Sequence, residues 1–465
     1  LATASSLVLL QLLSRIITFV LNQALVRLAP PEVFGTAAVQ FDLLLATILF
    51  LSRDGTRNAL LRANDAHPAS PQDAASAHAQ KPQTHASHIA NIALLPVYLG
   101  LPLSLLSSLL YLHTSTPEAR LQPLFAPSVY LYALGAFLVL LAEPLHIRAV
   151  NELRMGVRVR AEGTAVAANS AATFGIMLLG GPRWALAAFA LGKVVYGLTL
   201  LAVYLWEYRR EGPFYSLLPK PSTVKTAKGS KTTYFDSHLL RLALAMSGQG
   251  VVKHFLTEGD SLILARISSL KDQGGYAVAN NYGSLIARIV FLPLEETSRL
   301  FFSKTLSSAD TSAPSSTAPS PTPTPIADSL QSASSVLTTV LLLYTHLALF
   351  FLTLGPPLVP TLLAFLLPQR YLHTSAPRVL VAYCAYLPTM AFNGLLEAFF
   401  SSTAEQRDLA RQARAMLLFS ALFLAAAYTF VSTLELGEVG LVYANTLNLT
   451  LRAGYSYAYT RRYFS

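Results

Sequence analysis

Charged residues are scarce in this chain. They make up 12% of its 465 residues, about half of the ~25% that is usual in soluble domains. Hydrophobic residues make up 53%, and the mean hydropathy is +0.46. A soluble protein with so little charge could not cover its surface with polar groups. The chain contains apolar runs of about 20 residues, which is enough for a helix to cross a ~30 Å hydrocarbon core. The sequence therefore predicts an all-α polytopic membrane protein.

Residues that carry covalent or metal chemistry are also few. The single cysteine, Cys384, excludes an intrachain disulfide, and no Cys/His group has the spacing of metal ligands. Neither a Walker phosphate-binding loop nor a G-x-S-x-G nucleophile elbow occurs. We therefore expect no catalytic residue, no metal site and no cofactor, and an enzyme such as a membrane glycosyltransferase is disfavoured.

The apolar runs predict about 12 spans in two sets of six. The first set lies near residues 6–28, 36–61, 88–112, 124–147, 161–180 and 184–208. The second set lies near residues 239–267, 276–303, 331–355, 376–402, 411–433 and 438–460. The short apolar segment 356–368 either extends the ninth span or re-enters the membrane beside it.

Two polar linkers interrupt this pattern. Residues 209–236 are basic and separate a predicted N-terminal six-helix bundle, 1–208, from a C-terminal bundle, 237–465. Residues 304–329, inside the C-terminal bundle, are rich in Ser, Thr and Pro, a composition that is typical of disorder. We expect the two bundles to face a central cavity, because transporters built from paired repeats place their substrate between them.

Positive charge predicts the orientation of the chain. Arginine and lysine gather in the connections after even-numbered spans, such as Arg148, Arg154, Arg158 and Arg160 after the fourth. Cytoplasmic connections carry such an excess, so both ends of the chain are predicted to be cytoplasmic. Basic loops beside an anionic leaflet also explain the net charge of +10, which therefore does not call for a nucleic-acid partner.

An internal repeat is visible when the chain is shifted by 242 positions. FGTAAVQFDLLLATILFLSRDGTR, which is Phe34–Arg57, then lies over YAVANNYGSLIARIVFLPLEETSR, which is Tyr276–Arg299. The shift aligns Asp54 with Glu296 and Arg57 with Arg299. Because six spans return the chain to its starting side, the two halves would have the same topology.

Polar side chains recur at helical spacing within several of the predicted spans. The eighth span carries the stripe Asn281, Arg288, Leu292, Glu295 and Arg299, with Glu296 about 100° away. The other stripes are Gln11, Arg15, Thr18 and Asn22 in the first span; Asp42, Arg53 and Arg57 in the second; Gln249, Lys253, Thr257 and Asp260 in the seventh, beside His254 and Glu258; and Asn393 and Glu397 in the tenth.

Charge inside a span costs about 2.5–3.5 kcal/mol on insertion scales, so these stripes should face a bundle interior or water. Either the charges form pairs that hold helices together, or the stripes line a wet cavity; five such helices favour the cavity. Its cations would suit an anionic group, and the arginine fork suits phosphate oxygens. Arg158 and Arg160 lie where a cytoplasmic headgroup would enter.

The motifs LLQLLSRIITFVLNQ, LFLSRDGTRNA, FLTEGD, DQGGYAVANNYGSLIARIVFLPLEETSRLFF and FNGLLEAF resemble the eukaryotic RFT family. That family belongs to the multidrug/oligosaccharidyl-lipid/polysaccharide exporter superfamily, with the MATE and MurJ transporters. The resemblance implies an endoplasmic-reticulum protein that moves Man5GlcNAc2-pyrophosphoryl-dolichol from the cytosolic to the lumenal leaflet for N-glycosylation. It also implies about two further C-terminal spans, about 14 in all, and candidate partners among the N-glycosylation enzymes. The family's polar motif residues correspond here to Arg15, Asn22, Arg53, Arg57, Glu258, Asn281, Arg288, Glu295, Glu296 and Glu397.

These observations predict a flippase that works by alternating access. The residues expected to bind pyrophosphate and sugar are Arg15, Asn22, Arg53, Arg57, Arg158, Lys253, Asn281 and Arg288. Those expected to gate the cavity or balance its charge are Glu258, Asp260, Glu295, Glu296, Arg299 and Glu397. Glu295 and Glu296 would compete for the arginines when the lipid leaves. Two alternatives remain open: a protein that binds the glycolipid and hands it on without translocating it, and an ion-coupled exporter of the MATE type, which is disfavoured because the first span carries Arg15 and no acid.

Overall fold

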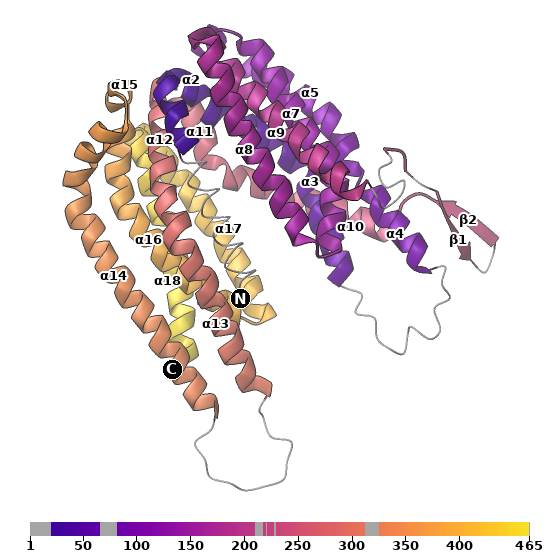
Figure 1. Ribbon diagram of the computed structural model, residues 1–465. Helices are drawn as coiled ribbons and strands as arrows, with labels where there is room; N and C mark the ends of the chain where they lie inside the picture. Colours follow the sequence, from indigo (N-terminus) through magenta and orange to yellow (C-terminus); the bar gives the residue numbers. More distant parts are fainter. Residues whose placement is uncertain are drawn as a thin grey trace. The chain divides into compact units, whose positions relative to one another are not determined.

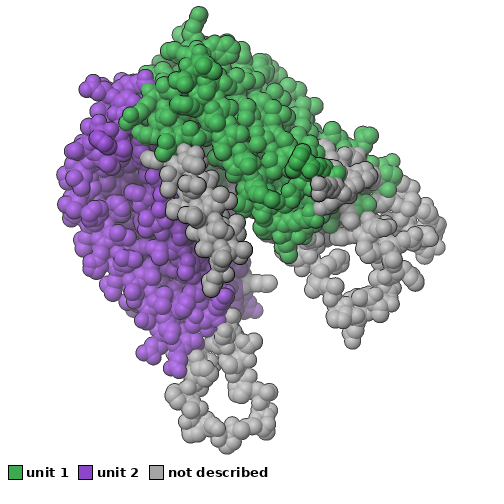
Figure 2. Space-filling model, viewed as in Figure 1, with its two compact units in different colours: residues 1–258 green, residues 259–465 purple. Residues whose placement is uncertain are grey.

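A computed structural model gives the structure of the chain (Figure 1). It describes residues 20–65, 81–209, 217–219, 221–226, 229–311 and 325–464. Within these ranges only the backbone is described at residues 61–65, 81–86, 222–232, 238, 249, 252, 253, 255, 256, 307–311, 325–327 and 406. The chain divides into two compact units, Leu1–Glu258 and Gly259–Ser465 (Figure 2).

The first unit is a helical bundle. After a helix through residues 20–28, its helices are α2 (Pro31–Gly35), the π-helix η1 (Thr36–Phe41), α3 (Asp42–Asp65), α4 (Lys81–Ile92), α5 (Leu95–Thr114), α6 (Pro117–Arg120), α7 (Phe125–Asn151), α8 (Met155–Gly180), the 3₁₀-helix η2 (Pro182–Trp184), α9 (Ala185–Tyr208) and α10 (Ser237–Thr257). Helix α3 packs against α5, α7 and α10, while α7 packs against α5 and α9. Helix α8 packs against α9, so that α3, α7, α8 and α9 are linked by direct contacts.

The second unit is also helical. Its helices are α11 (Gly259–Ile267), α12 (Leu270–Ile286), the π-helix η3 (Ala287–Phe291), α13 (Leu292–Thr311), α14 (Pro325–Leu366), α15 (Gln369–Leu372), α16 (Ala376–Thr403), α17 (Gln406–Tyr428), the π-helix η4 (Thr429–Thr433) and α18 (Glu438–Phe464). Helix α16 packs against α13, α14 and α18, while α14 packs against α13 and α18 against α17.

The packing of the second unit repeats that of the first. The helix pairs α3·α5, α5·α7, α3·α7, α7·α9 and α8·α9 correspond in order to α13·α14, α14·α16, α13·α16, α16·α18 and α17·α18. In each unit these helices are the second to sixth of the predicted set. This agreement supports the internal repeat that the 242-residue shift indicates.

Aromatic and small side chains form the interior of each unit. In the first, Tyr204 and Tyr208 are fully buried beside Leu145 and Ala161, where α7, α8 and α9 meet. In the second, Phe302 and Phe399 are fully buried, and their rings meet edge to face at 5.1 Å between centroids. The stripe residues of α3 and α13, such as Arg57 and Glu295, are not part of these apolar interiors.

Among the described residues, eight helices are long and apolar enough to cross a membrane. They lie at Pro31–Leu60, Ser87–Thr114, Phe125–Asn151, Met155–Gly180, Pro182–Tyr208, Asp328–Leu366, Ala376–Thr403 and Arg407–Thr433. Large apolar side chains cover their outer surfaces, such as Leu179, which is 90% exposed, and Phe365, which is 82% exposed. Such exposure suits lipid and not water, which confirms an all-α polytopic membrane protein.

The predicted spans from 36–61 to 438–460 coincide with helix, and most of the first, 6–28, lies outside the described residues. The third, 88–112, crosses a turn at residues 93 and 94, between α4 and α5. The seventh, 239–267, is two helices instead of one, because the chain breaks at Glu258 between α10 and α11. The short segment 356–368 continues α14 through Leu366, so extension of the ninth span is correct and re-entry is wrong.

The predicted linkers contain more structure than their composition indicates. Residues 209–236 include the antiparallel hairpin β1 (Ser222–Thr226) and β2 (Gly229–Thr233). The predicted disordered loop 304–329 is helical at both ends, since α13 continues to Thr311 and α14 begins at Pro325. Residues 312–324, between them, lie outside the described residues.

Helix α10 lies on the N-terminal side of the division between the two units, although the sequence places it in the C-terminal bundle 237–465. It packs against the face of α3 that carries Thr47, Phe50 and Gly55. The Thr47 hydroxyl and His254 Nε2 are 2.9 Å apart, and the rings of Phe50 and His254 stack at 5.0 Å. Gly55 has no side chain, which allows α10 to approach α3 closely. Because α10 packs on α3, it belongs to the first unit, which ends at Glu258.

Candidate functional site

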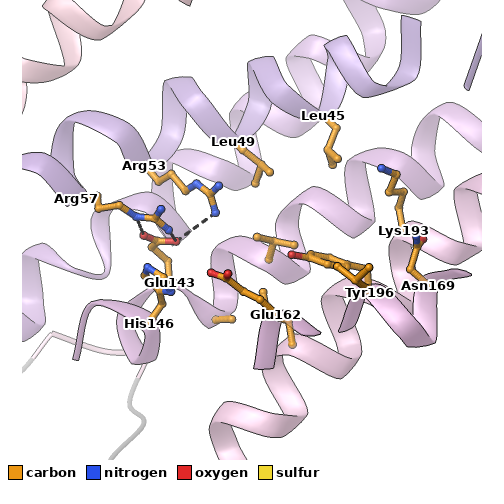
Figure 3. A pocket seen from close by; sticks show the side chains of 14 residues that line it. Leu45, Leu49, Arg53, Arg57, Glu143, His146, Glu162, Asn169, Lys193 and Tyr196 are labelled. Carbon is orange, nitrogen blue, oxygen red and sulfur yellow. Dashed lines mark hydrogen bonds and ion pairs between the residues drawn. The ribbon is translucent and has the colours of Figure 1, made fainter. Parts of the chain in front are cut away.

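A cavity of about 370 Å³ lies inside the first unit, between α3, α7, α8 and α9 (Figure 3). It is lined by Leu45, Leu49, Arg53, Arg57, Val139, Ala142, Glu143, His146, Glu162, Val166, Asn169, Lys193, Tyr196 and Leu200. The four residues from α3 follow one another at a spacing of four, which keeps them on one face of the helix. Arg53 and Arg57 of the polar stripe predicted for the second span face the cavity, whereas Asp42, the third residue of that stripe, does not line it.

Glu143 is the centre of the charge network at one end of the cavity. Arg57 donates from Nε to Oε1 at 2.6 Å and from Nη2 to Oε2 at 2.7 Å, a bidentate pair. Arg53 donates from Nη1 to Oε2 at 3.4 Å. Glu143 is only 1% exposed, so its carboxylate is removed from solvent and depends on these two arginines.

The opposite end of the cavity carries Lys193, Asn169 and the ring of Tyr196 (Figure 3). Lys193 Nζ forms an ion pair of 2.8 Å with Asp42 Oδ1, which comes from the start of α3. The side chains of this pair are 24% and 44% exposed, respectively. Lys193 is thus about as exposed as Arg53 and Arg57, and it differs from them in having a partly exposed carboxylate as its partner.

His146 lies one turn after Glu143 on α7 and also lines the cavity. Its Nδ1 is 3.0 Å from the hydroxyl of the fully buried Tyr204 on α9. The contact holds the imidazole against α9, which fixes the side of the cavity behind the Arg57–Glu143 pair.

The structure brings only some of the predicted binding residues together. Arg53 and Arg57 line this cavity, which lies inside the first unit, whereas the sequence predicted a cavity that both bundles face. Arg158 does not; it pairs with Glu162, its neighbour one turn along α8, at 3.0 Å. Asn22 is exposed on the helix through 20–28. Arg15 lies outside the described residues, and the side chain of Lys253 is not described.

Sequence reasoning did not predict Glu143 and Lys193 as site residues. Glu143 precedes Pro144 near the end of an apolar span, and a carboxylate at that depth is itself a signal, because intramembrane charge is costly unless paired. In this cavity Glu143 pairs with both Arg53 and Arg57, and Asp42 pairs with Lys193, so these three cations share two acids.

A second polar cluster lies in the second unit, between α13, α16 and α18. Glu295 and Arg299 form the predicted i,i+4 pair, at 2.7 Å. Glu397 accepts hydrogen bonds from Arg452 Nη2 to both carboxylate oxygens, at 2.9 and 2.8 Å, and from Asn393 Nδ2 at 3.1 Å. Arg452, on α18, was not among the predicted residues, although Asn445, Asn448, Arg452, Ser456 and Thr460 follow one another at helical spacing and could have indicated it.

The other predicted residues of the second unit do not join this cluster. Asn281 and Glu296 are exposed, and Arg288 donates to the backbone oxygen and hydroxyl of Ser284 on its own helix. Asp260 lies in the first turn of α11, where its carboxylate accepts from the Ser261 backbone at 2.7 Å. Glu258, the last residue of the first unit, lies at the break between α10 and α11.

Gly394 explains how the Glu295 carboxylate fits against α16. A β-carbon at this glycine would lie 2.7 Å from Glu295 Oε2. We predict that Gly394→Ala turns the Glu295 carboxylate aside and changes the free energy of unfolding by less than about 1 kcal/mol, because the end of a flexible side chain can move and alanine favours a helix by about 0.5–1 kcal/mol. The double variant Gly394→Ala/Glu295→Ala should then be at least as stable as Glu295→Ala alone. A loss of more than about 2 kcal/mol in the single variant, measured by denaturant unfolding, would show that the carboxylate cannot move.

Comparison with known proteins gives the family. The sequence profile of the Rft protein family matches residues 1–465. Proteins named Man(5)GlcNAc(2)-PP-dolichol translocation protein RFT1 are similar over nearly the whole chain. The protein from Eremothecium gossypii is 33% identical over 99% of this chain and 82% of its own length, and that from Saccharomyces cerevisiae is 30% identical over 97% and 81%.

The fold has solved counterparts. An inward-facing MATE family multidrug transporter of the MOP superfamily matches with a TM-score of 0.61, over 96% of this chain and 94% of its own. The inward closed lipid II flippase MurJ matches with a TM-score of 0.59, over 97% and 86%. Both are 13% identical to this chain, so the likeness concerns the fold alone. The chain has the fold of these transporters, and it belongs to the Rft protein family.

Proposed function

We propose that this chain translocates Man5GlcNAc2-pyrophosphoryl-dolichol between the leaflets of the endoplasmic-reticulum membrane, with no catalytic chemistry of its own. Support comes from relatives of that name that match nearly the full chain, and from a transporter fold. The observation that carries the proposal is the pair of arginine side chains, Arg53 and Arg57, that face a cavity from one side of α3. Two guanidinium groups offer several N–H donors, which match the oxygens of a pyrophosphate.

Glu143 supplies a way to empty and reset this site. Without lipid, its carboxylate pairs with both arginines and offsets one of their two positive charges, which lowers the cost of buried charge. A pyrophosphate offers the same arginines more oxygens and more negative charge, so it competes with Glu143 for them. When the lipid leaves, the ion pair re-forms. The sequence predicted that Glu295 and Glu296 compete with the lipid for the arginines. In this proposal Glu143 does so instead, while Glu295 pairs with Arg299 in the second unit.

The surroundings of the proposed site fit an alternating-access transporter. The dolichol tail would remain in the lipid while the headgroup enters between the helices. Arg158, at the start of α8, pairs with Glu162, which lines the cavity; we keep Arg158 in the proposal as an entry residue on the cytoplasmic side. Cytoplasmic termini and N-glycosylation enzymes as partners remain part of the same proposal.

Two other functions would use the same cavity differently. A binding and handover protein would hold the glycolipid without moving it, and this alternative shares every residue of the site. An exporter of the MATE type would need the cavity to accept a cation. The acids lining this cavity, Glu143 and Glu162, each lie beside an arginine, which disfavours the exporter.

The test is translocation in liposomes. The purified full chain is reconstituted with Man5GlcNAc2-pyrophosphoryl-dolichol, and the accessibility of the sugar on each face is followed over time. We expect faster translocation than in protein-free vesicles and its loss on Arg53→Ala. Arg183→Ala is the matched control, because Arg183 is an exposed arginine of the same unit that does not line the cavity. Saturable binding without faster translocation would favour handover; absence of binding would refute both.

A further inference from the structure

The cavity of the first unit has two chemically different ends. Arg53, Arg57 and Glu143 form one end, and Lys193 and Asn169 form the other (Figure 3). Tyr196 projects from α9 between them with its hydroxyl toward the middle of the cavity, opposite Leu45 and Leu49 (Figure 3). The cavity can therefore contact two chemical groups that follow one another in a single ligand.

The volume of the cavity limits how much of the glycolipid it can hold. At about 370 Å³ it lies near the lower end of the ~300–1,000 Å³ that is usual for small-molecule sites. A heptasaccharide headgroup cannot enter such a space, whereas a pyrophosphate followed by one sugar ring can. The remaining sugars would have to extend beyond these helices.

We propose that this cavity recognises the pyrophosphate together with the first sugar attached to it, an N-acetylhexosamine, and that it does not read the distal mannoses. The proposal rests on the proposed function and specifies its substrate class. The pyrophosphate lies at Arg53 and Arg57, and the sugar lies against Tyr196 within reach of Asn169 and Lys193.

The orientation of the ligand follows from the charges. The arginine end provides two guanidinium groups that share one carboxylate. The lysine end provides one ammonium group that already has its own carboxylate, Asp42, at 2.8 Å. The doubly charged pyrophosphate is therefore better balanced at the arginine end.

The other end has the groups that a sugar needs. The face of Tyr196 offers an apolar surface for a pyranose ring, and its hydroxyl is a donor and acceptor. Asn169 carries an amide, which can donate to and accept from hydroxyl and acetamido groups. The Lys193–Asp42 pair is partly exposed, so sugar hydroxyls can replace water there at little desolvation cost.

Binding of the purified full chain tests this inference. The probes are short-chain polyprenyl pyrophosphates that carry a methyl group in place of the sugar, one GlcNAc, GlcNAc2, or Man5GlcNAc2, so that all four have the same two charges; each is titrated by competition. We expect the first GlcNAc to improve affinity about tenfold, the value of one or two added hydrogen bonds and a ring contact. The later sugars should change it by less than about threefold.

Variants separate the two ends. Tyr196→Ala and Asn169→Ala should each remove most of the gain from the first GlcNAc while binding of the methyl-capped pyrophosphate stays. Tyr196→Phe keeps the ring and should retain most of that gain, and it also serves if the alanine variant fails to fold. Tyr130→Ala, on the exposed outer side of α7, is the matched control. Arg57→Ala should weaken all four probes alike.

The outcomes distinguish this inference from the proposed function. Equal affinity for the methyl-capped and the GlcNAc-bearing pyrophosphate would overturn the inference and leave the proposed pyrophosphate site standing. Affinity that rises with each mannose would also overturn it. Failure of all four probes to bind would refute the proposed function and, with it, this inference.

Discussion

Replacing Arg57 with alanine is expected to destabilise the first unit and to abolish binding of the glycolipid. The change removes both short hydrogen bonds to Glu143 and leaves a carboxylate that is 1% exposed with Arg53 at 3.4 Å. Breaking a buried ion pair typically costs about 3–5 kcal/mol. We expect about 3 kcal/mol, because Arg53 can move toward the carboxylate. The measurement is the free energy of unfolding in detergent, followed by helicity.

The double variant Arg57→Ala/Glu143→Gln separates stability from binding. Glutamine removes the buried charge, so most of the lost stability should return. Binding of Man5GlcNAc2-pyrophosphoryl-dolichol should not return, because the guanidinium donors are still missing. If the double variant bound the glycolipid like the wild type, Arg57 would be a structural residue only and the pyrophosphate site would lie elsewhere.

Local sequence patterns predicted the positions of most helices that the structure describes. Apolar runs of membrane-spanning length predicted where the helices lie, and the spacing of Arg53 and Arg57 predicted that both face the same side of α3. The i,i+4 pair of Glu295 and Arg299 was predicted for the same reason. Each of these features depends on residues within a few turns of one another.

Features that depend on distant residues could not be predicted in this way. Arg57 and Glu143 are 86 positions apart, and nothing near either residue names its partner. Arg452 and Glu397 are 55 positions apart, on helices joined through α17. The motifs therefore predicted which residues share a helix face, and not which distant residues they contact.

Gly55 belongs to a local sequence motif and also controls a long-range contact. It lies within the motif SRDGTR, between the two cavity arginines. At 100° per residue it points about 200° away from Arg53 and from Arg57, toward α10. A β-carbon at Gly55 would lie 2.5 Å from the α-carbon of Ser247 and closer still to its amide nitrogen and hydroxyl. We predict that Gly55→Ala forces α3 and α10 apart. The cost should reach or exceed the upper end of the about 1–3 kcal/mol usual for overpacking, because backbone atoms cannot rotate out of the way.

Two further variants show whether backbone contact is the cause. Adding Ser247→Gly to Gly55→Ala removes the hydroxyl but leaves the amide nitrogen and α-carbon in place, so the double variant should recover only a minor part of the lost stability. Gly163→Ala, within α8, meets nothing within 4 Å and should be neutral or stabilising by up to about 1 kcal/mol. Complete recovery in the double variant would assign the effect to the serine side chain. Wild-type stability of Gly55→Ala would contradict the close approach of α3 and α10.

Because α3 carries Gly55 on one face and the cavity arginines on the other, a separation of α3 from α10 should also weaken glycolipid binding. Gly55→Ala should then lower affinity and stability together, whereas Gly163→Ala should lower neither.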